Sequence, residues 1–154
     1  NARLELGFSG ERFTAELPPD SNTVWRIAAD AKLTWGGFGM WGEVLHQSGA
    51  NVNAHPYSGD ATADPPIAGH ASTDNTYLLA GVEYTLACVT ARYNLSIARY
   101  GDLHVQEVLH LPGLGLAFND QFSFLAEYAV WNRFAPEGTS DVDHSLNLTW
   151  MGHF

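Results

Sequence analysis

The sequence has no long hydrophobic run. Nowhere in its 154 residues is there anything close to the roughly 18 to 20 consecutive apolar residues that a membrane-spanning helix requires. If the chain crosses a membrane, it must do so with β-strands, because a closed barrel is the other structure that pairs every backbone group in lipid. The hydrophobic content of 45% is also ordinary for a soluble protein, so hydropathy alone does not decide between the two.

Cysteine and positive charge are scarce as well. The single cysteine, Cys88, cannot form an internal disulfide, and we expect it to pack as a small apolar side chain. Lys and Arg number 7 against 17 Asp and Glu, a net charge of -10, which argues against nucleic acid or an anionic membrane surface as partner. Asn1 is not preceded by an initiator Met or a basic signal segment, so we expect a processed protein or a piece of a longer one.

The sequence does contain strict two-residue alternation, most clearly at its C-terminus. In residues 144–154 the apolar side chains Leu146, Leu148, Trp150 and Phe154 fall on one face, and Ser145, Asn147, Thr149 and His153 fall on the other. Such a strand suits a wall with lipid outside and water inside. This is the repeat of a transmembrane β-barrel.

Residues 24–35 repeat the pattern with a tryptophan at either end. Trp25 and Trp35 would lie at the two interfaces between water and lipid, where aromatic residues gather. Between them Ile27, Ala29, Ala31 and Leu33 share the apolar face, whereas Arg26, Asp30, Lys32 and Thr34 share the polar face. Helical spacing would scatter both sets.

Counting similar segments predicts about nine strands. Short turns are expected near residues 9–11, 36–37, 86–87 and 119–120, and longer linkers at residues 18–23, 47–75, 100–104 and 135–143. Outer-membrane barrels alternate short periplasmic turns with long external loops in this way. Residues 108–118 are less regular, because Pro112 removes a ladder donor and Gly113 weakens a strand.

The expected fold is therefore all-β, an antiparallel transmembrane β-barrel formed by residues 1–154 as a single domain. Single-chain bacterial barrels normally have an even strand count. An odd count would leave Asn1 at the outer surface, which indicates either missing N-terminal strands or a miscounted segment. Of the two, we favour the C-terminal portion of a larger barrel.

Several of these segments together resemble a known family. They are the hairpin Asp30–Glu43, the long linker, the segment Tyr77–Tyr84 and the closing strand that ends in Phe154. Over roughly residues 24–154 the chain resembles the C-terminal part of phosphate-selective-type porins. The resemblance implies an outer-membrane channel, often trimeric, that passes small solutes, and a terminal aromatic that the outer-membrane assembly machinery recognises.

Charged residues on the polar face are the candidate pore lining. They are Arg26, Asp30, Lys32, Glu43, Glu83, Arg92 and Glu127. Rings of fixed charge set the ion preference of a pore. The alternative reading is that these residues form cross-strand salt bridges that fill a narrow, closed barrel. The set is poor in Lys and Arg, so it does not support phosphate selectivity.

Aromatic residues near strand ends are the candidate membrane-interface set: Trp25, Trp35, Tyr84, Trp150 and Phe154. The linker at residues 47–75 is expected to be an extracellular loop or a constriction folded into the lumen. His46, His55, His70, Asp60, Asp64 and Asp74 lie in or beside it, but their spacing matches no compact metal motif. No metal site and no cofactor are predicted.

Catalysis is not expected. His144 and Ser145 are neighbours on a strand, so they point to opposite faces and cannot form a nucleophile and base pair. The sequence predicts a porin of a Gram-negative outer membrane, with outer-membrane lipid, lipopolysaccharide and small hydrophilic solutes as partners. Two alternatives remain open: a non-transporting barrel that anchors an envelope complex, and a secreted, soluble β-sandwich that binds a ligand.

Overall fold

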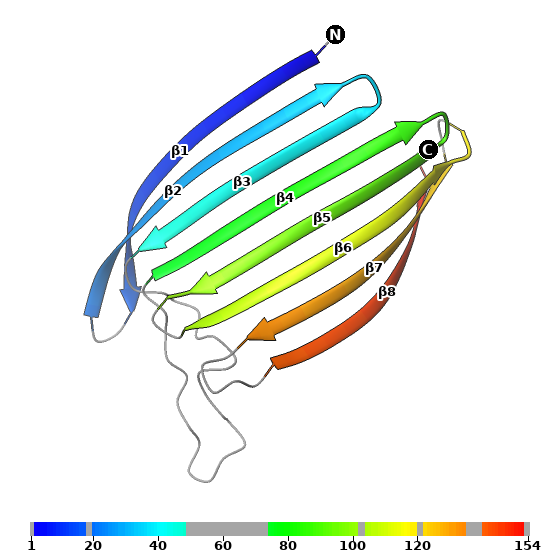
Figure 1. The fold of residues 1–154 in the computed structure, drawn as a ribbon. Helices are drawn as coiled ribbons and strands as arrows, with labels where there is room; N and C mark the ends of the chain where they lie inside the picture. The colour runs from blue at the N-terminus through cyan, green and yellow to red at the C-terminus, as the bar shows by residue number, and fades with distance from the viewer. Residues whose placement is uncertain are drawn as a thin grey trace.

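The fold is a single antiparallel sheet of eight strands that follow one another in chain order (Figure 1). The computed structural model describes residues 2–17, 20–48, 74–101, 104–119, 122–134 and 140–152, the side chains of residues 13–17 and 20–24 excepted. The strands are β1 (Ala2–Leu17), β2 (Asp20–Trp35), β3 (Phe38–Ser48), β4 (Asp74–Leu86), β5 (Val89–Tyr100), β6 (Val105–Ala117), β7 (Phe122–Phe134) and β8 (Ser140–Gly152). The prediction of an all-β, antiparallel fold is confirmed.

The predicted count of nine strands is wrong, because residues 9–11 do not form a turn. Ser9 pairs with Ala28 and Gly10 with Ile27, so β1 continues through this segment. Ser9 and Gly10 favour a turn locally, but continuous pairing with β2 keeps them in an extended strand. The linker expected at residues 18–23 is also wrong, since β2 already begins at Asp20. With eight strands, β1 starts and β8 ends at the same end of the sheet, measured along the strands (Figure 1).

Tight turns at that end of the strands join β2 to β3 and β4 to β5. Trp35 pairs with Phe38 around Gly36, whose φ of 57° is the positive value that a primed hairpin turn needs at its first central residue. Leu86 pairs with Val89, and here the positive φ of 52° falls on Ala87. At the opposite end, residues 49–73 separate β3 from β4 and lie outside the described residues.

Among the described strands, the hydrogen-bonded ladder is interrupted only between β6 and β7. His110 pairs with Val130 and Gly113 with Glu127, but Leu111 and Pro112 have no partner on β7. Proline has no N–H to donate, which explains the gap. The register is the same on both sides of the gap, so the strand continues in line.

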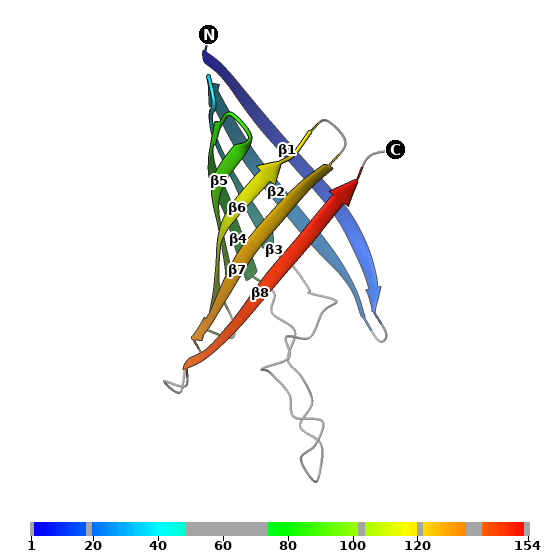
Figure 2. The same ribbon diagram turned by 90° about the vertical axis from the view of Figure 1, so that its right-hand side faces the viewer.

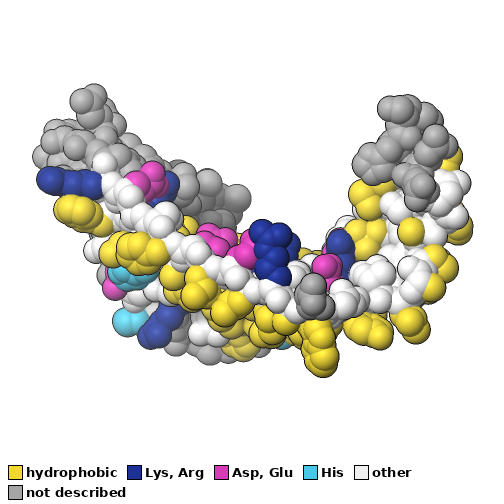
Figure 3. All heavy atoms as spheres, turned by 90° about the horizontal axis from the view of Figure 1, so that it is seen from above, with side chains coloured by type: hydrophobic (Ala, Val, Ile, Leu, Met, Phe, Trp, Pro, Cys, Tyr) yellow, Lys and Arg dark blue, Asp and Glu magenta, His cyan; other side chains and the backbone are white. Residues whose placement is uncertain are grey.

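The sheet is bent into a trough that separates two kinds of side chain. Seen along the trough, most charged residues lie on the inner, concave face, and hydrophobic residues cover most of the outer, convex face (Figure 3). In Figure 2, β1 and β8 curve toward the same side of the molecule, to the right of β4 and β5. Within the described part of the chain, each of these two strands has a neighbouring strand on one side only, so the sheet is open.

This sheet has almost no core. Among the described residues, Val105 and Leu125 are the buried hydrophobic side chains, while Trp25 is 51% and Trp35 69% exposed. A β-sandwich would bury such residues against a second sheet, and the described strands form one sheet. The described residues contain no helix that is long and apolar enough to cross a membrane.

Candidate functional site

The concave face brings together all seven charged residues that the sequence singled out. The register places Asp30 opposite Glu43 and Glu83 opposite Arg92. Directly paired residues point to the same side of a sheet, so one face carries the whole set. These residues come from β2, β3, β4, β5 and β7: Arg26, Asp30, Lys32, Glu43, Glu83, Arg92 and Glu127.

Arg26 is held between two neighbouring strands. Its Nη1 lies 2.9 Å from Oε1 of Glu11 on β1, and its Nε donates a hydrogen bond of 2.8 Å to Oε1 of Gln47 on β3. Gln47 is only 6% exposed. The guanidinium therefore has both a charge partner and a fixed orientation.

Arg92 reaches across a strand to its partner. Its Nη2 lies 2.7 Å from Oε1 of Glu127, although β6 lies between the two residues. Gly113 occupies the intervening position, where an added Cβ would come within 3.1 Å of the Glu127 side chain and 3.2 Å of that of Arg92. The glycine that looked like a weakness of β6 makes room for this ion pair.

The remaining charges of the set are not neutralised. Among the described residues, Asp30, Lys32, Glu43 and Glu83 make no ion pair shorter than 4.0 Å. Asp30 and Glu43 lie directly opposite each other. The paired arginines leave an excess of carboxylates on this face, which favours cations near it and disfavours anions.

Other concave-face charges were not found from the sequence. Arg133 Nε lies 3.1 Å from Oε1 of Glu107, and Arg3 Nε lies 2.8 Å from Oε1 of Glu5. Also missed were Glu11, Asp141 and Asp143. The turn expected at residues 9–11 and the linker expected at residues 135–143 hid the alternation that would have placed these last three.

Four of the five predicted interface aromatics lie on the convex face. Trp35 and Tyr84 flank Phe38 at the end with the tight turns, and Trp25 lies toward the opposite end. Trp150 stacks on Phe118 with ring centroids 5.6 Å apart. The exposed fractions are 51% for Trp25, 69% for Trp35, 53% for Tyr84 and 63% for Trp150. Phe154 lies outside the described residues.

Two of the histidine and aspartate residues near the long linker meet. His46 Nε2 lies 3.6 Å from Oδ1 of Asp74, and His46 Nδ1 lies 3.1 Å from Oγ1 of Thr76. His55, His70, Asp60 and Asp64 lie outside the described residues. Within the described part of the chain, no group of three or more His, Cys, Asp and Glu side chains is placed to hold a metal ion.

Comparison with known proteins identifies no relative of this chain. No protein-family model matches it, and no curated protein and no solved structure matches it either. The resemblance to phosphate-selective-type porins therefore rests on the sequence segments alone.

Proposed function

We propose that the sheet is part of the wall of a transmembrane β-barrel in a Gram-negative outer membrane, and that the barrel is a porin for small hydrophilic solutes. The observation that carries the proposal is the division between the two faces. Apolar side chains are exposed on the convex side, and ionisable side chains line the concave side (Figure 3). In water this arrangement leaves a large apolar surface uncovered, whereas lipid outside and solvent inside suit both faces.

Two pairs of polar side chains on the convex face fit a lipid environment because their members contact each other. The hydroxyl of Tyr93 lies 2.6 Å from Nδ1 of His110, and that of Tyr128 lies 3.0 Å from Nδ1 of His144. An unpaired polar group in hydrocarbon is costly, since no water is there to replace the missing bond. The pairing supports a lipid-facing role for this surface.

Closure of the barrel requires partners for both edge strands. β1 and β8 each have one hydrogen-bonding side without a neighbour, and an open edge is not tolerated in hydrocarbon. We place the eight strands in a larger barrel, because the diameter grows with strand number and an eight-stranded barrel is filled by its own side chains. A larger lumen leaves space for solutes beside the concave-face charges.

The excess of carboxylates makes the proposed pore prefer cations. Arg26 and Arg92 are engaged by Glu11 and Glu127, while the carboxyl groups of Asp30, Glu43 and Glu83 face the lumen without a cationic partner among the described residues. Fixed negative charge in a pore concentrates cations and repels anions. Selective passage of phosphate is not part of the proposal.

Planar bilayers test this function directly. The full-length protein, extracted from outer membranes in mild detergent, is expected to migrate differently on a gel before and after heating. It is then expected to form channels with a reversal potential that favours potassium over chloride. A folded, detergent-requiring protein without conductance would point to the non-transporting barrel, and a protein that stays in solution without detergent would overturn the membrane assignment.

A further inference from the structure

Arg99 stands out among the described arginines because no partner engages it. Arg3, Arg26, Arg92 and Arg133 form ion pairs, and the guanidinium of Arg12 lies 4.9 Å from the ring centroid of Trp25. Arg99 has no ion pair, hydrogen bond or aromatic contact with other described residues. It also lies on the convex face, since it pairs with Thr76, and Thr76 pairs with His46.

A polar pocket surrounds this arginine at the end of the strands that lies opposite the tight turns. Its volume is about 420 Å³, and it is lined by His46, Asp74, Thr76, Arg99, Gly101 and His104. The backbone holds the pocket in shape: Gly101 N donates to Asp74 O at 2.7 Å, and His104, with a φ of 52°, donates from its N to Gly101 O at 3.3 Å. Donors for an anion therefore gather where the convex face changes from apolar to polar.

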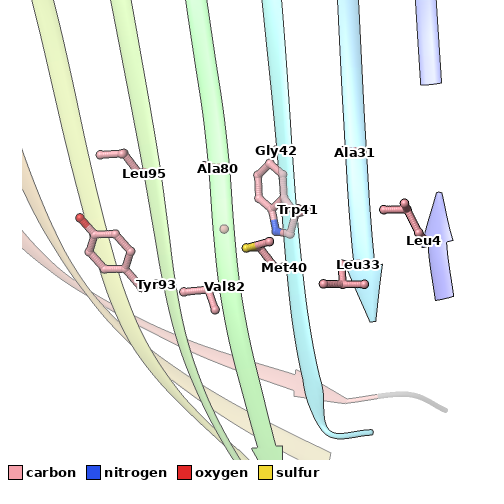
Figure 4. A pocket seen from close by; sticks show the side chains of 11 residues that line it. Leu4, Ala31, Leu33, Met40, Trp41, Gly42, Ala80, Val82, Tyr93 and Leu95 are labelled. Carbon is pink, nitrogen blue, oxygen red and sulfur yellow. The ribbon is translucent and has the colours of Figure 1, made fainter. Parts of the chain in front are cut away.

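The same strands carry an apolar hollow nearer the tight turns (Figure 4). Its volume is about 470 Å³. The small residues Ala31, Gly42 and Ala80 leave space there, and larger side chains such as Met40, Val82 and Leu95 border it. Leu95 precedes Arg99 by four positions on β5, which is about 13 Å along the strand. A polar pocket and an apolar hollow thus lie in line on β3, β4 and β5.

We propose that this line is a binding site for one phosphate-bearing lipid of the outer leaflet, with its phosphate at Arg99 and an acyl chain in the hollow. This proposal rests on the membrane assignment above. Arg99 supplies a charge-assisted donor to the phosphate, a bond roughly twice as strong as one between neutral groups. The hollow supplies apolar contact for methylene groups that a smooth wall would lack.

Asp74 defines the kind of headgroup that fits. Its carboxylate lies beside His46 in the same pocket and would repel a second anion. A headgroup that carries hydroxyl or amine donors next to its phosphate suits this mixture of charges. The phosphorylated glucosamine of lipid A carries hydroxyl and amide N–H donors near its phosphate and acyl chains for the hollow, whereas inorganic phosphate has no acyl chain.

Native mass spectrometry of the full-length protein in mild detergent tests the site. The probes are bis-phosphorylated lipid A, its dephosphorylated form and inorganic phosphate. Arg99→Gln is expected to weaken binding of the phosphorylated lipid by about tenfold and to leave the dephosphorylated lipid unchanged. Ala80→Leu, which fills the hollow, is expected to weaken binding of both lipids.

Arg12→Gln is the matched control, since Arg12 lies on the same face but rests on Trp25. It is expected to bind lipid within about twofold of the unchanged protein. The site would be overturned if Arg12→Gln and Arg99→Gln weakened lipid binding equally. It would also be overturned if Arg99→Gln left lipid binding unchanged, or if Ala80→Leu did. Inorganic phosphate that binds as tightly as the lipid would overturn it as well.

Channel recordings on the same samples separate this proposal from the porin proposal. Lipid binding that depends on Arg99 in a protein without conductance would overturn the pore and keep the lipid site. Conductance in a protein that fails the lipid test would do the reverse. A protein that is soluble without detergent would overturn both.

Discussion

Arg92 and Glu127 form an ion pair across an intervening strand, over the position of Gly113. The two side chains are 31% and 17% exposed, so solvent screens them only in part. The pair ties β5 to β7 without any hydrogen bond between these strands. Its geometry depends on the absence of a side chain at position 113.

Removing one member of this pair is expected to destabilise the sheet. In Arg92→Met the half-buried carboxylate of Glu127 loses its partner, and we expect the free energy of unfolding to fall by about 1–3 kcal/mol. Urea titration of the protein in vesicles measures it. Arg92→Met combined with Glu127→Met should recover part of the loss, whereas Arg3→Met, which breaks an exposed pair, should change little. Equal effects of Arg92→Met and Arg3→Met would contradict the assigned role.

The unpaired carboxylates are expected to control ion preference. Asp30→Asn combined with Glu43→Gln removes two neighbouring negative charges and should lower the ratio of potassium to chloride permeability. Lys32→Gln changes the same region in the opposite sense and should raise it. Reversal potentials under a salt gradient give the ratios. Shifts of the same sign in both variants would show that fixed charge does not set the preference.

The turn between β4 and β5 contains avoidable strain. Ala87 has a φ of 52°, a region that costs a residue with a Cβ about 1–2 kcal/mol and that glycine enters freely. We therefore expect Ala87→Gly to raise the free energy of unfolding by about 0.5–1 kcal/mol. Ala91→Gly, within β5, is the control and should lower it by a similar amount. A lower free energy of unfolding in Ala87→Gly would show that the positive φ of Ala87 does not destabilise the protein.

Glycine at position 81 accommodates the indole of Trp41 on the concave face. The two residues are paired across β3 and β4, and a Cβ at position 81 would overlap the indole nitrogen. Gly81→Ala is expected to cost about 1–3 kcal/mol through overpacking. Combining it with Trp41→Ala removes the overlap with the indole, although not the 2.6 Å approach to Oδ1 of Asn94, and should give a cost smaller than the sum of the two single variants. Additive costs would mean that the two side chains do not compete for space.

The alternation of apolar and polar residues predicted the fold well because it shows that the two faces of each strand lie in different environments. Residues 24–35 needed no tertiary information, since the apolar face is continuous and only Val24 and Ala28 interrupt the polar face. The turn at residues 36–37 was equally clear, because it needs a positive φ that Gly36 supplies. Local chemistry decides such features.

What the sequence could not predict depends on partners far along the chain. Ser9 and Gly10 look like a turn, but a full ladder with β2 keeps them extended. The ion pair of Arg92 with Glu127 depends on the register of three strands, which alternation alone does not fix. The unpaired state of Arg99 likewise emerges only once every other arginine has been placed.

The linker between β3 and β4 can be replaced without disturbing the register on either side. Ser48 and Asp74 lie directly opposite each other at the ends of these strands, so a short Asn-Gly turn can join them in place of residues 49–73. We expect this variant to insert and to keep its heat-modifiable migration, because the strands themselves are unchanged. If the linker narrows the lumen, as one interpretation of the sequence holds, single-channel conductance should rise. Identical conductance in the shortened and full-length proteins would exclude a constriction and leave the concave-face charges as the selective element.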